Sequence, residues 1–295
     1  MRLSILIPTY NYDCSRLIRQ LHGQLPPDGE LIVGDDCSTD QDAVLRNSQA
    51  ARLPGCRIFR PACNLGRAAI RNALAREAKG EWLLFVDADA EVRSESFIAD
   101  YLSQAAGREV VCGGTGNLPR CPRPEARLRY DYEVAAEGRL TLAQRRRFPY
   151  AQFTTFNFLI RRDTFLAILF DESLHQYGHE DTRFGLALRQ RGIEVHHIEN
   201  KLTHLGLEDA DVYLSKTETA LSSLASMDIG QRRHVRVSSL ALRLRRLHLL
   251  GLVRLLFAVS KPLLRANLLG KHPNQKLFAF YKLGYYAAIP SATRL

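Results

Sequence analysis

The chain has 295 residues, of which 46% are hydrophobic and 24% are charged. This is an ordinary globular composition, with enough length to bury a core. The six cysteines form no CxxC pair, so we expect reduced thiols in the cytosol and no zinc site. No apolar run reaches about 18 residues and the first residues do not resemble a signal peptide, so a membrane-spanning helix is not expected.

Strand and helix signals alternate through the first hundred residues. We expect strands at 3–8, 30–34, 57–60 and 81–86, and helices at 13–24, 40–51 and 66–79. Later strands are expected at 109–112, 156–160 and 193–198, a helix at 180–191, and a loop at 112–123. The alternation predicts an α/β fold in which a parallel sheet is sandwiched between helices. A composition shift near 206–230 suggests a catalytic domain at 1–206 and a helical extension at 207–295.

The formal net charge of +10 is unevenly placed along the chain. No Asp or Glu follows Asp228, whereas residues 229–295 carry 13 Lys and Arg, so the part before them has a net charge of −3. This asymmetry predicts an anionic partner for the C-terminal segment, either a membrane or a nucleic acid.

Polar clusters follow three of the expected strands, at Thr9–Asn11, Asp35-Asp36 and Asp87–Asp89. In α/β sheets, ligands bind beyond the carboxyl ends of the strands. Two carboxylates at Asp87 and Asp89, beside a buried strand, are costly unless a positive group sits there. Mg²⁺ or Mn²⁺ shared with substrate phosphates fits such a pair, and the alternative is a solvated acidic turn.

A basic helix start follows the third expected strand, between Asp35-Asp36 and Asp87 in the sequence. Asn64 and Gly66 form a turn, and Arg67 and Arg71, four residues apart, share one face of the next helix. Two cations near a helix N-terminus suit a diphosphate, although an ordinary basic helix surface would look the same.

Five segments in this order and spacing resemble glycosyltransferase family 2, whose members have the GT-A fold. The segments are SILIPTYN (4–11), ELIVGDDCSTD (30–40), NLGRAAIRN (64–72), GEWLLFVDADAEV (80–92) and GHEDTRFGLALRQRG (178–192). The resemblance covers roughly residues 1–206. It implies a Rossmann-like mixed sheet flanked by helices.

The resemblance also implies roles for the donor-binding residues. Pro8, Thr9 and Tyr10 match the segment that lines the nucleotide base, and Asp36 matches the acid that hydrogen-bonds uracil. Arg71 resembles the basic residue near the donor phosphates.

The resemblance implies a metal site as well. Asp87-Ala88-Asp89 matches the DxD motif, in which Asp89 is the more direct ligand of Mn²⁺ or Mg²⁺. His204 resembles a late histidine that completes this site, although it could also be a structural histidine.

Glu180-Asp181 resembles the family's ED motif, whose acid serves as general base. The same two acids could simply complement the dipole at the start of a helix. As chemistry, a carboxylate near the acceptor takes the hydroxyl proton during attack, and we favour Asp181 for this role.

The expected reaction transfers one sugar to an acceptor hydroxyl, with inversion at the anomeric carbon. The expected donor is a nucleoside diphosphate sugar in which the nucleotide is UDP. A saccharide or lipid-linked saccharide acceptor would place the enzyme in surface polysaccharide or glycolipid assembly. The chain lacks the long apolar segments and the QxxRW-type motif of processive members, so a synthase with its own channel is not expected. Two alternatives stay open: a sugar-1-phosphate nucleotidyltransferase-like enzyme, and a non-enzymatic membrane-surface binding protein.

The basic C-terminal segment, 231–295, suggests a cytoplasmic protein peripheral to the inner face of a membrane. Leu240–Phe257 is interpreted as one amphipathic helix with Arg243, Arg246 and Arg254 on one side, lying on anionic lipid. An aromatic cluster at Phe278, Phe280, Tyr281, Tyr285 and Tyr286 would assist. The alternatives are packing on the core or a homodimer contact. A nucleic-acid partner is not expected, because no nucleic-acid-binding module is recognisable.

Overall fold

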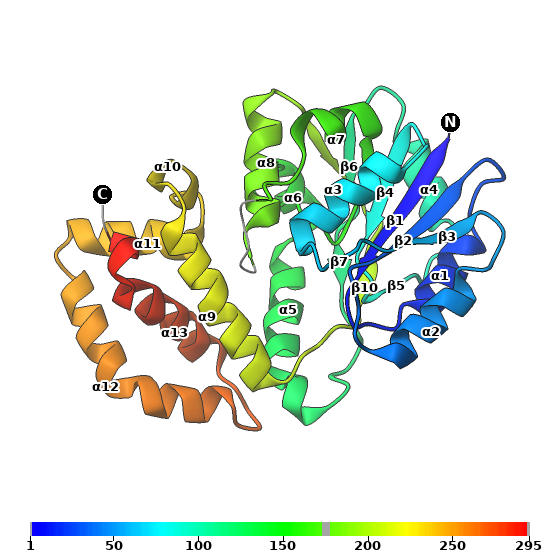
Figure 1. Ribbon diagram of the computed structural model, residues 1–295. Helices are drawn as coiled ribbons and strands as arrows, with labels where there is room; N and C mark the ends of the chain where they lie inside the picture. Colours follow the sequence, from blue (N-terminus) through cyan, green and yellow to red (C-terminus); the bar gives the residue numbers. More distant parts are fainter. Residues whose placement is uncertain (1, 173–177, 294–295) are drawn as a thin grey trace. The chain divides into compact units, whose positions relative to one another are not determined.

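A computed structural model describes residues 2–172 and 178–293 of the chain (Figure 1). The described residues divide into two compact units. The first comprises 2–117, 139–172 and 180–206, and the second comprises 118–138, 178–179 and 207–293. Compactness alone does not show which segments fold independently, so the division at residue 206 stays a prediction.

The first unit is built on a seven-stranded mixed sheet with the order β3-β2-β1-β4-β8-β6-β9. The strands are β1 (Leu3–Thr9), β2 (Glu30–Asp35), β3 (Cys56–Phe59), β4 (Trp82–Val86), β6 (Val110–Cys112), β8 (Asn157–Arg161) and β9 (Val195–His197). The first four pair in parallel, as the alternation of strands and helices predicts. β8 runs antiparallel to both β4 and β6, so the expectation of a purely parallel sheet is wrong at this strand, and the mixed sheet of the GT-A fold is confirmed.

Helices cover both faces of this sheet (Figure 1). One face packs against α1 (Ser15–His22), α2 (Gln41–Ala50) and α4 (Phe97–Ser103), and the other against α3 (Arg67–Glu77), α7 (Arg162–Ile168) and α8 (Glu180–Gln190). Each face of the sheet has its own hydrophobic core. Successive side chains of a strand point to opposite faces, so Leu3, Ile5 and Ile7 pack in the core on the α1, α2 and α4 side, and Leu6 packs in the core on the other side. Because β1 is buried on both faces, its sequence is nearly continuous in apolar residues.

A second, three-stranded sheet brings distant segments together. Its strands are β5 (Ala90–Glu91), β7 (Thr115–Gly116) and β10 (Leu202–His204), in the order β5-β10-β7. β10 runs antiparallel to β5 and pairs His204 with Ala90. This register places His204 close to Asp89, the residue that precedes Ala90.

The second unit is helical. It contains η1 (Pro124–Ala126), α5 (Arg127–Arg139), α9 (Ala210–Ser226), α10 (Ile229–Arg232), α11 (Arg236–Arg246), α12 (Leu250–Leu268), α13 (Gln275–Ala288) and η2 (Pro290–Thr293). The remaining described helix, α6 (Leu142–Arg147), belongs to the first unit. In the described part of the chain, no single helix has the length and apolar character needed to cross a membrane. α11 and α12 meet these criteria only when taken together, as a pair bent by 119°.

Two expectations for the C-terminal segment are wrong. Leu240–Phe257 is not one helix, because α11 ends at Arg246 and the chain turns at His248, whose φ of 58° is left-handed. Arg243 and Arg254 therefore lie on different helices. The aromatic cluster is also not a surface feature, since Phe278, Tyr281 and Tyr286 are buried in the core of this unit.

Candidate active site

Three strands end side by side at one edge of the large sheet. β1 ends at Thr9, β2 ends beside it at Asp35, and β4 ends one residue before Asp87. The Asp36 amide donates to the Thr9 carbonyl at 2.9 Å and extends the pairing of β1 with β2 by one residue. The three polar clusters of the sequence therefore lie at one edge, where an α/β sheet binds its ligands.

The segment expected to line the nucleotide base has one exposed side chain. Pro8 and Thr9 are buried in β1, whereas Tyr10 is 52% exposed. The Thr9 hydroxyl donates to the Tyr12 carbonyl at 3.1 Å and so stabilises the turn that follows the strand. Of the three residues, Tyr10 is therefore the one whose ring can stack on a ligand.

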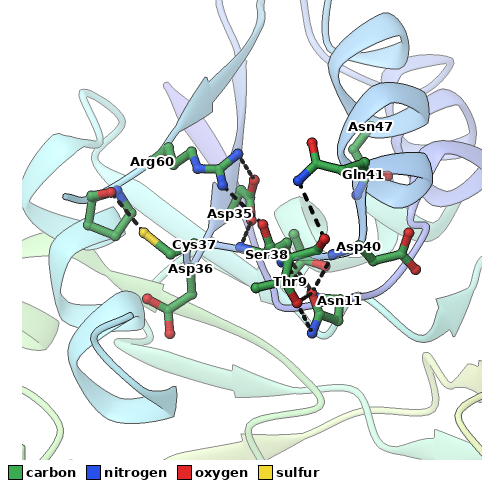
Figure 2. Close-up of polar contacts among 12 residues, drawn as sticks. Thr9, Asn11, Asp35, Asp36, Cys37, Ser38, Asp40, Gln41, Asn47 and Arg60 are labelled. Atoms are coloured by element: carbon green, nitrogen blue, oxygen red, sulfur yellow. Dashed lines mark hydrogen bonds and ion pairs between the residues drawn. The ribbon is translucent and has the colours of Figure 1, made fainter. Parts of the chain in front are cut away.

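Asn11, in the polar cluster after β1, holds the loop that follows β2, a role that was not expected from the sequence. It has a left-handed φ of 51°, and its side-chain oxygen accepts hydrogen bonds from the amides of Thr39 and Asp40 at 2.7 and 3.0 Å. Figure 2 shows Asn11 beneath the loop formed by residues 36–40. Arg60 Nη1 lies 3.1 Å from Asp35 Oδ2 at the start of the same loop. An Asn after a strand can tolerate a left-handed φ and bond its neighbours' amides, which is the signal that could have identified it.

Asp36 organises the start of α3. Its carboxylate accepts from the amides of Leu65 and Gly66 at 2.7 and 2.9 Å, and the Asn64 side chain donates to its carbonyl at 2.8 Å. In Figure 2 the carboxylate points away from the Asp35–Arg60 pair. Each carboxylate oxygen has two lone pairs, so Asp36 keeps acceptor capacity for a further donor.

Arg67 and Arg71 share one face of α3, as their spacing predicts, and both reach carboxylates. Arg71 is 3% exposed and its guanidinium contacts Asp87, while its Nε, also buried, has no hydrogen-bond partner among the described residues. Arg67 Nε donates to Glu180 Oε1 at 2.8 Å, and its Nη2 lies 3.8 Å from Asp87 Oδ2. The two arginines thus connect Asp87, which follows β4, with Glu180 in the first turn of α8.

The predicted metal ligands are partly assembled. His204 Nε2 lies 3.1 Å from Asp89 Oδ2, whereas Asp87 is turned toward the arginines. No group of three His, Cys, Asp or Glu side chains within 2–172 and 178–293 is arranged to hold a metal ion. Burial raises the pKa of Asp87, and Arg71 and Arg67 oppose this shift.

The residues fit a divalent cation in chemistry. Two carboxylates and an imidazole nitrogen suit Mn²⁺. A Cβ on Gly206 would lie 2.0 Å from Asp89 Oδ2, so only glycine there leaves room for the carboxylate beside His204. Ala88, between the two acids, packs against the core and supplies no polar side chain.

Glu180 and Asp181 occupy the first turn of α8, and their pKa values are shifted in opposite directions. Burial raises the pKa of Glu180, but the charges of Arg67 and Arg71, together with hydrogen bonds to the carboxylate, lower it by more, so the net pKa is lowered. Burial, together with the Glu180 charge, raises the pKa of Asp181 to about 6. Asp181 Oδ1 also accepts the Thr182 amide at 2.7 Å. Of the two acids, Asp181 therefore has the proton affinity of a base that works near neutral pH.

A buried arginine fixes the Gly113–Gly114 segment. Arg145 donates to Gly113 O at 2.9 Å and to Ile198 O at 3.1 Å, and Asn157 Nδ2 donates to Gly114 O at 2.6 Å. A Cβ on Gly113 would lie 2.2 Å from Asn157 Oδ1. The start of the expected 112–123 loop is thus rigidly held, and no local sequence signal connects it to Arg145.

Solved structures of glycosyltransferases have the same fold. A mannosyltransferase from Pyrobaculum calidifontis, in complex with GDP-Man and Mn²⁺, has a TM-score of 0.61 at 15% identity, over 98% of this chain and 85% of that one. Residues 1–349 of S. aureus TarS, in complex with UDP-GlcNAc, have a TM-score of 0.51 at 19% identity, over 79% of this chain and 69% of that one. The class is that of the GT-A glycosyltransferases.

Residues 4–169 match the family model Glycosyl transferase family 2, and the chain belongs to this family. A poly(ribitol-phosphate) beta-glucosyltransferase from Bacillus spizizenii is 35% identical over 106 residues, which is 34% of this chain and 17% of that enzyme. The chain spans 29% and 17% of the length of two curated relatives that share 38% and 35% identity with it.

Proposed function

We propose that the protein transfers a single sugar from a UDP-linked donor to an acceptor hydroxyl, with inversion at the anomeric carbon. The observation that carries this proposal is the meeting of Asp36, Arg71, Asp87 and Asp89 at the ends of β1, β2 and β4, with Asp181 at the start of α8. All five lie in the first unit. Family membership favours this reaction over nucleotidyl transfer.

The donor would lie along this edge of the sheet. Tyr10 and Asp36 would contact the uracil, and Asp36 would accept its ring N–H. Arg67 and Arg71 are already held close to carboxylates, and a diphosphate would give them a second anion, including an acceptor for the unpartnered Arg71 Nε. The UDP-GlcNAc bound by TarS supports a uridine nucleotide, and the GDP-Man of the mannosyltransferase shows that the fold accepts another.

Asp89, His204 and Asp87 would hold Mn²⁺ or Mg²⁺, which when bound neutralises charge on the departing diphosphate. Asp87 would have to turn from Arg71 toward Asp89 to join the other two. The Mn²⁺ in the mannosyltransferase complex supports a divalent ion in this fold.

Asp181 would act as the general base. The acceptor oxygen forms a bond to the anomeric carbon while the bond from that carbon to the diphosphate oxygen breaks. The acceptor's proton passes to the Asp181 carboxylate, and the electron pair leaves with the diphosphate. A single displacement of this kind inverts the anomeric centre.

The acceptor we propose is a saccharide or lipid-linked saccharide in surface polysaccharide or glycolipid assembly. The Bacillus relative acts on poly(ribitol phosphate), a polyol phosphate polymer, which supports an acceptor of this general kind. The experiment is nucleotide release from a panel of UDP- and GDP-sugars with Mn²⁺ and mixed saccharide acceptors. Release of UDP from at least one UDP-sugar supports the proposal, and release from none of the panel contradicts it.

Asp36→Asn is expected to weaken UDP binding by ~1.5–3 kcal/mol, because a charged acceptor to the uracil N–H is replaced by an amide. Asn keeps an acceptor oxygen for one of the two amides, Leu65 or Gly66, that bond to the two carboxylate oxygens of Asp36. Calorimetry with UDP measures the change, and calorimetry with pyrophosphate should show little difference, since the base is missing.

Asp40→Asn is the matched control. It removes the same charge from the same loop and keeps the cap that Asp40 gives to the Ala43 amide. Equal UDP affinity in the Asp36 and Asp40 variants would rule out a role for Asp36 at the base.

A further inference from the structure

Helix α12 of the second unit has two opposite apolar faces. At 100° per residue, Leu250, Phe257, Leu264 and Leu268 fall on one side, and all four are buried in the core of the unit. Five more apolar residues fall within about 100° of arc on the other side. They are Leu252, Leu255, Leu256, Val259 and Leu263, and they are 51–76% exposed. We call these five residues the outer face of α12; the helix itself is drawn in orange in Figure 1.

The charged residues of α12 point away from the outer face. Arg254 Nε donates to Ala287 O at 2.7 Å, and Arg265 Nη1 donates to Glu218 Oε1 at 3.0 Å. Lys261 Nζ lies 5.9 and 5.7 Å from the ring centres of Phe257 and Tyr285. The whole of α12 lies in the described part of the chain, and its outer face carries no charged side chain. An apolar stripe of this size is costly to leave in water.

Exposed cations stand at both ends of the outer face. Arg243 and Arg246 are in the last turn of α11, just before α12, and Lys271 follows the helix. No acidic residue follows Asp228 anywhere in the sequence. An apolar surface framed by unopposed positive charge is complementary to an anionic lipid leaflet, where side chains enter the acyl boundary and cations meet phosphates.

A second copy of the chain is a poorer occupant. A twofold contact sets the same patch against itself, so the cations at the ends of one outer face would meet those of the other. With no acidic residue after Asp228, nothing in this segment would neutralise them.

We infer that the outer face of α12 inserts shallowly into an anionic membrane leaflet, with Arg243, Arg246 and Lys271 on lipid phosphates. The outer face belongs to the second unit, whereas the residues proposed for sugar transfer belong to the first. It also replaces the surface expected from the sequence, because Phe278, Tyr281 and Tyr286 are buried in the core and Arg254, on the side of α12 away from the outer face, donates to Ala287 O.

The test is co-sedimentation of the full chain with vesicles of phosphatidylcholine, with and without phosphatidylglycerol, at low and high salt. The chain is expected to bind the anionic vesicles at low salt and to bind less at high salt. The triple variant Leu255→Gln/Leu256→Gln/Val259→Gln should lose roughly 100-fold in partitioning, because three side chains no longer gain from leaving water. Arg243→Gln/Arg246→Gln should lose roughly tenfold on anionic vesicles.

The matched control is Val212→Gln/Ile229→Gln/Leu277→Gln, which removes three exposed apolar side chains of the same unit from outside α12. It should bind vesicles as the unmodified chain does, and thermal melts should show all variants folded. The inference is overturned if the unmodified chain stays in the supernatant at low salt, or if the α12 variant binds as well as the control. It is also overturned if sedimentation shows a dimer that only the α12 variant breaks and neither protein binds lipid. None of these readouts requires donor or turnover, so they are independent of the proposed transfer reaction.

Discussion

Asp89→Asn is expected to lower the rate of sugar transfer by ~10³-fold or more, while the protein remains folded. The substitution removes a charged ligand beside His204, and an amide is a poor replacement on a divalent cation. The core is unaffected, because Asp89 lies in the turn between β4 and β5. Turnover with Mn²⁺ and calorimetric titration of Mn²⁺ in the presence of UDP should both show the loss.

Glu95→Gln is the control for this variant, since it removes an exposed carboxylate a few residues further along the same segment. It should behave as the unmodified protein does. Full activity of Asp89→Asn, or normal activity of the unmodified protein in EDTA, would mean that the DxD motif does not hold a catalytic metal here.

Asp181→Asn is expected to reduce turnover by ~10²–10⁴-fold with little change in donor affinity, because the acceptor's proton loses its base. Glu180→Gln is the matched control on the neighbouring residue. It should have a smaller effect on turnover, since Glu180 is bound to Arg67. If Glu180→Gln is the slow variant and Asp181→Asn is nearly normal, the two roles are reversed.

The pH profile gives an independent reading of the same base. With a pKa of about 6, Asp181 is protonated below that pH and cannot accept a proton, so kcat/KM should fall about tenfold per pH unit there and level off above it. The Glu180 charge contributes to the raised pKa. Glu180→Gln should therefore move the acidic limb to lower pH, whereas an unmoved limb would show that another group titrates.

The sheet and its edge were predictable because their signals are local. The run Trp82–Val86 is continuous in apolar residues and Leu3–Pro8 is interrupted only by Ser4, so the polar residues that follow each run are expected at the end of a strand. The helical face shared by Arg67 and Arg71 follows from spacing alone. Their partners do not, since Glu180 lies 113 residues from Arg67 and meets it only through the packing of α8 near α3.

The C-terminal segment was the least predictable, because helical periodicity does not reveal where a helix breaks. The leucines of 240–257 suit one continuous helix, but the left-handed turn at His248 divides them between α11 and α12. The burial of the aromatic residues depends on a close approach: a Cβ on Gly284 would lie 2.5 Å from the Phe257 ring. Which of two apolar faces of α12 meets the core is likewise decided by tertiary packing.

We propose that the edge formed by β1, β2 and β4 binds the donor diphosphate through a metal held by Asp89 and His204. The decisive experiment is a crystal structure with UDP and Mn²⁺, with anomalous scattering recorded for manganese. We expect one manganese peak within bonding distance of the Asp89 carboxylate, His204 Nε2 and a diphosphate oxygen, with the uracil beside Asp36. Diphosphate bound away from this edge, or a manganese peak without Asp89 as a ligand, would contradict it.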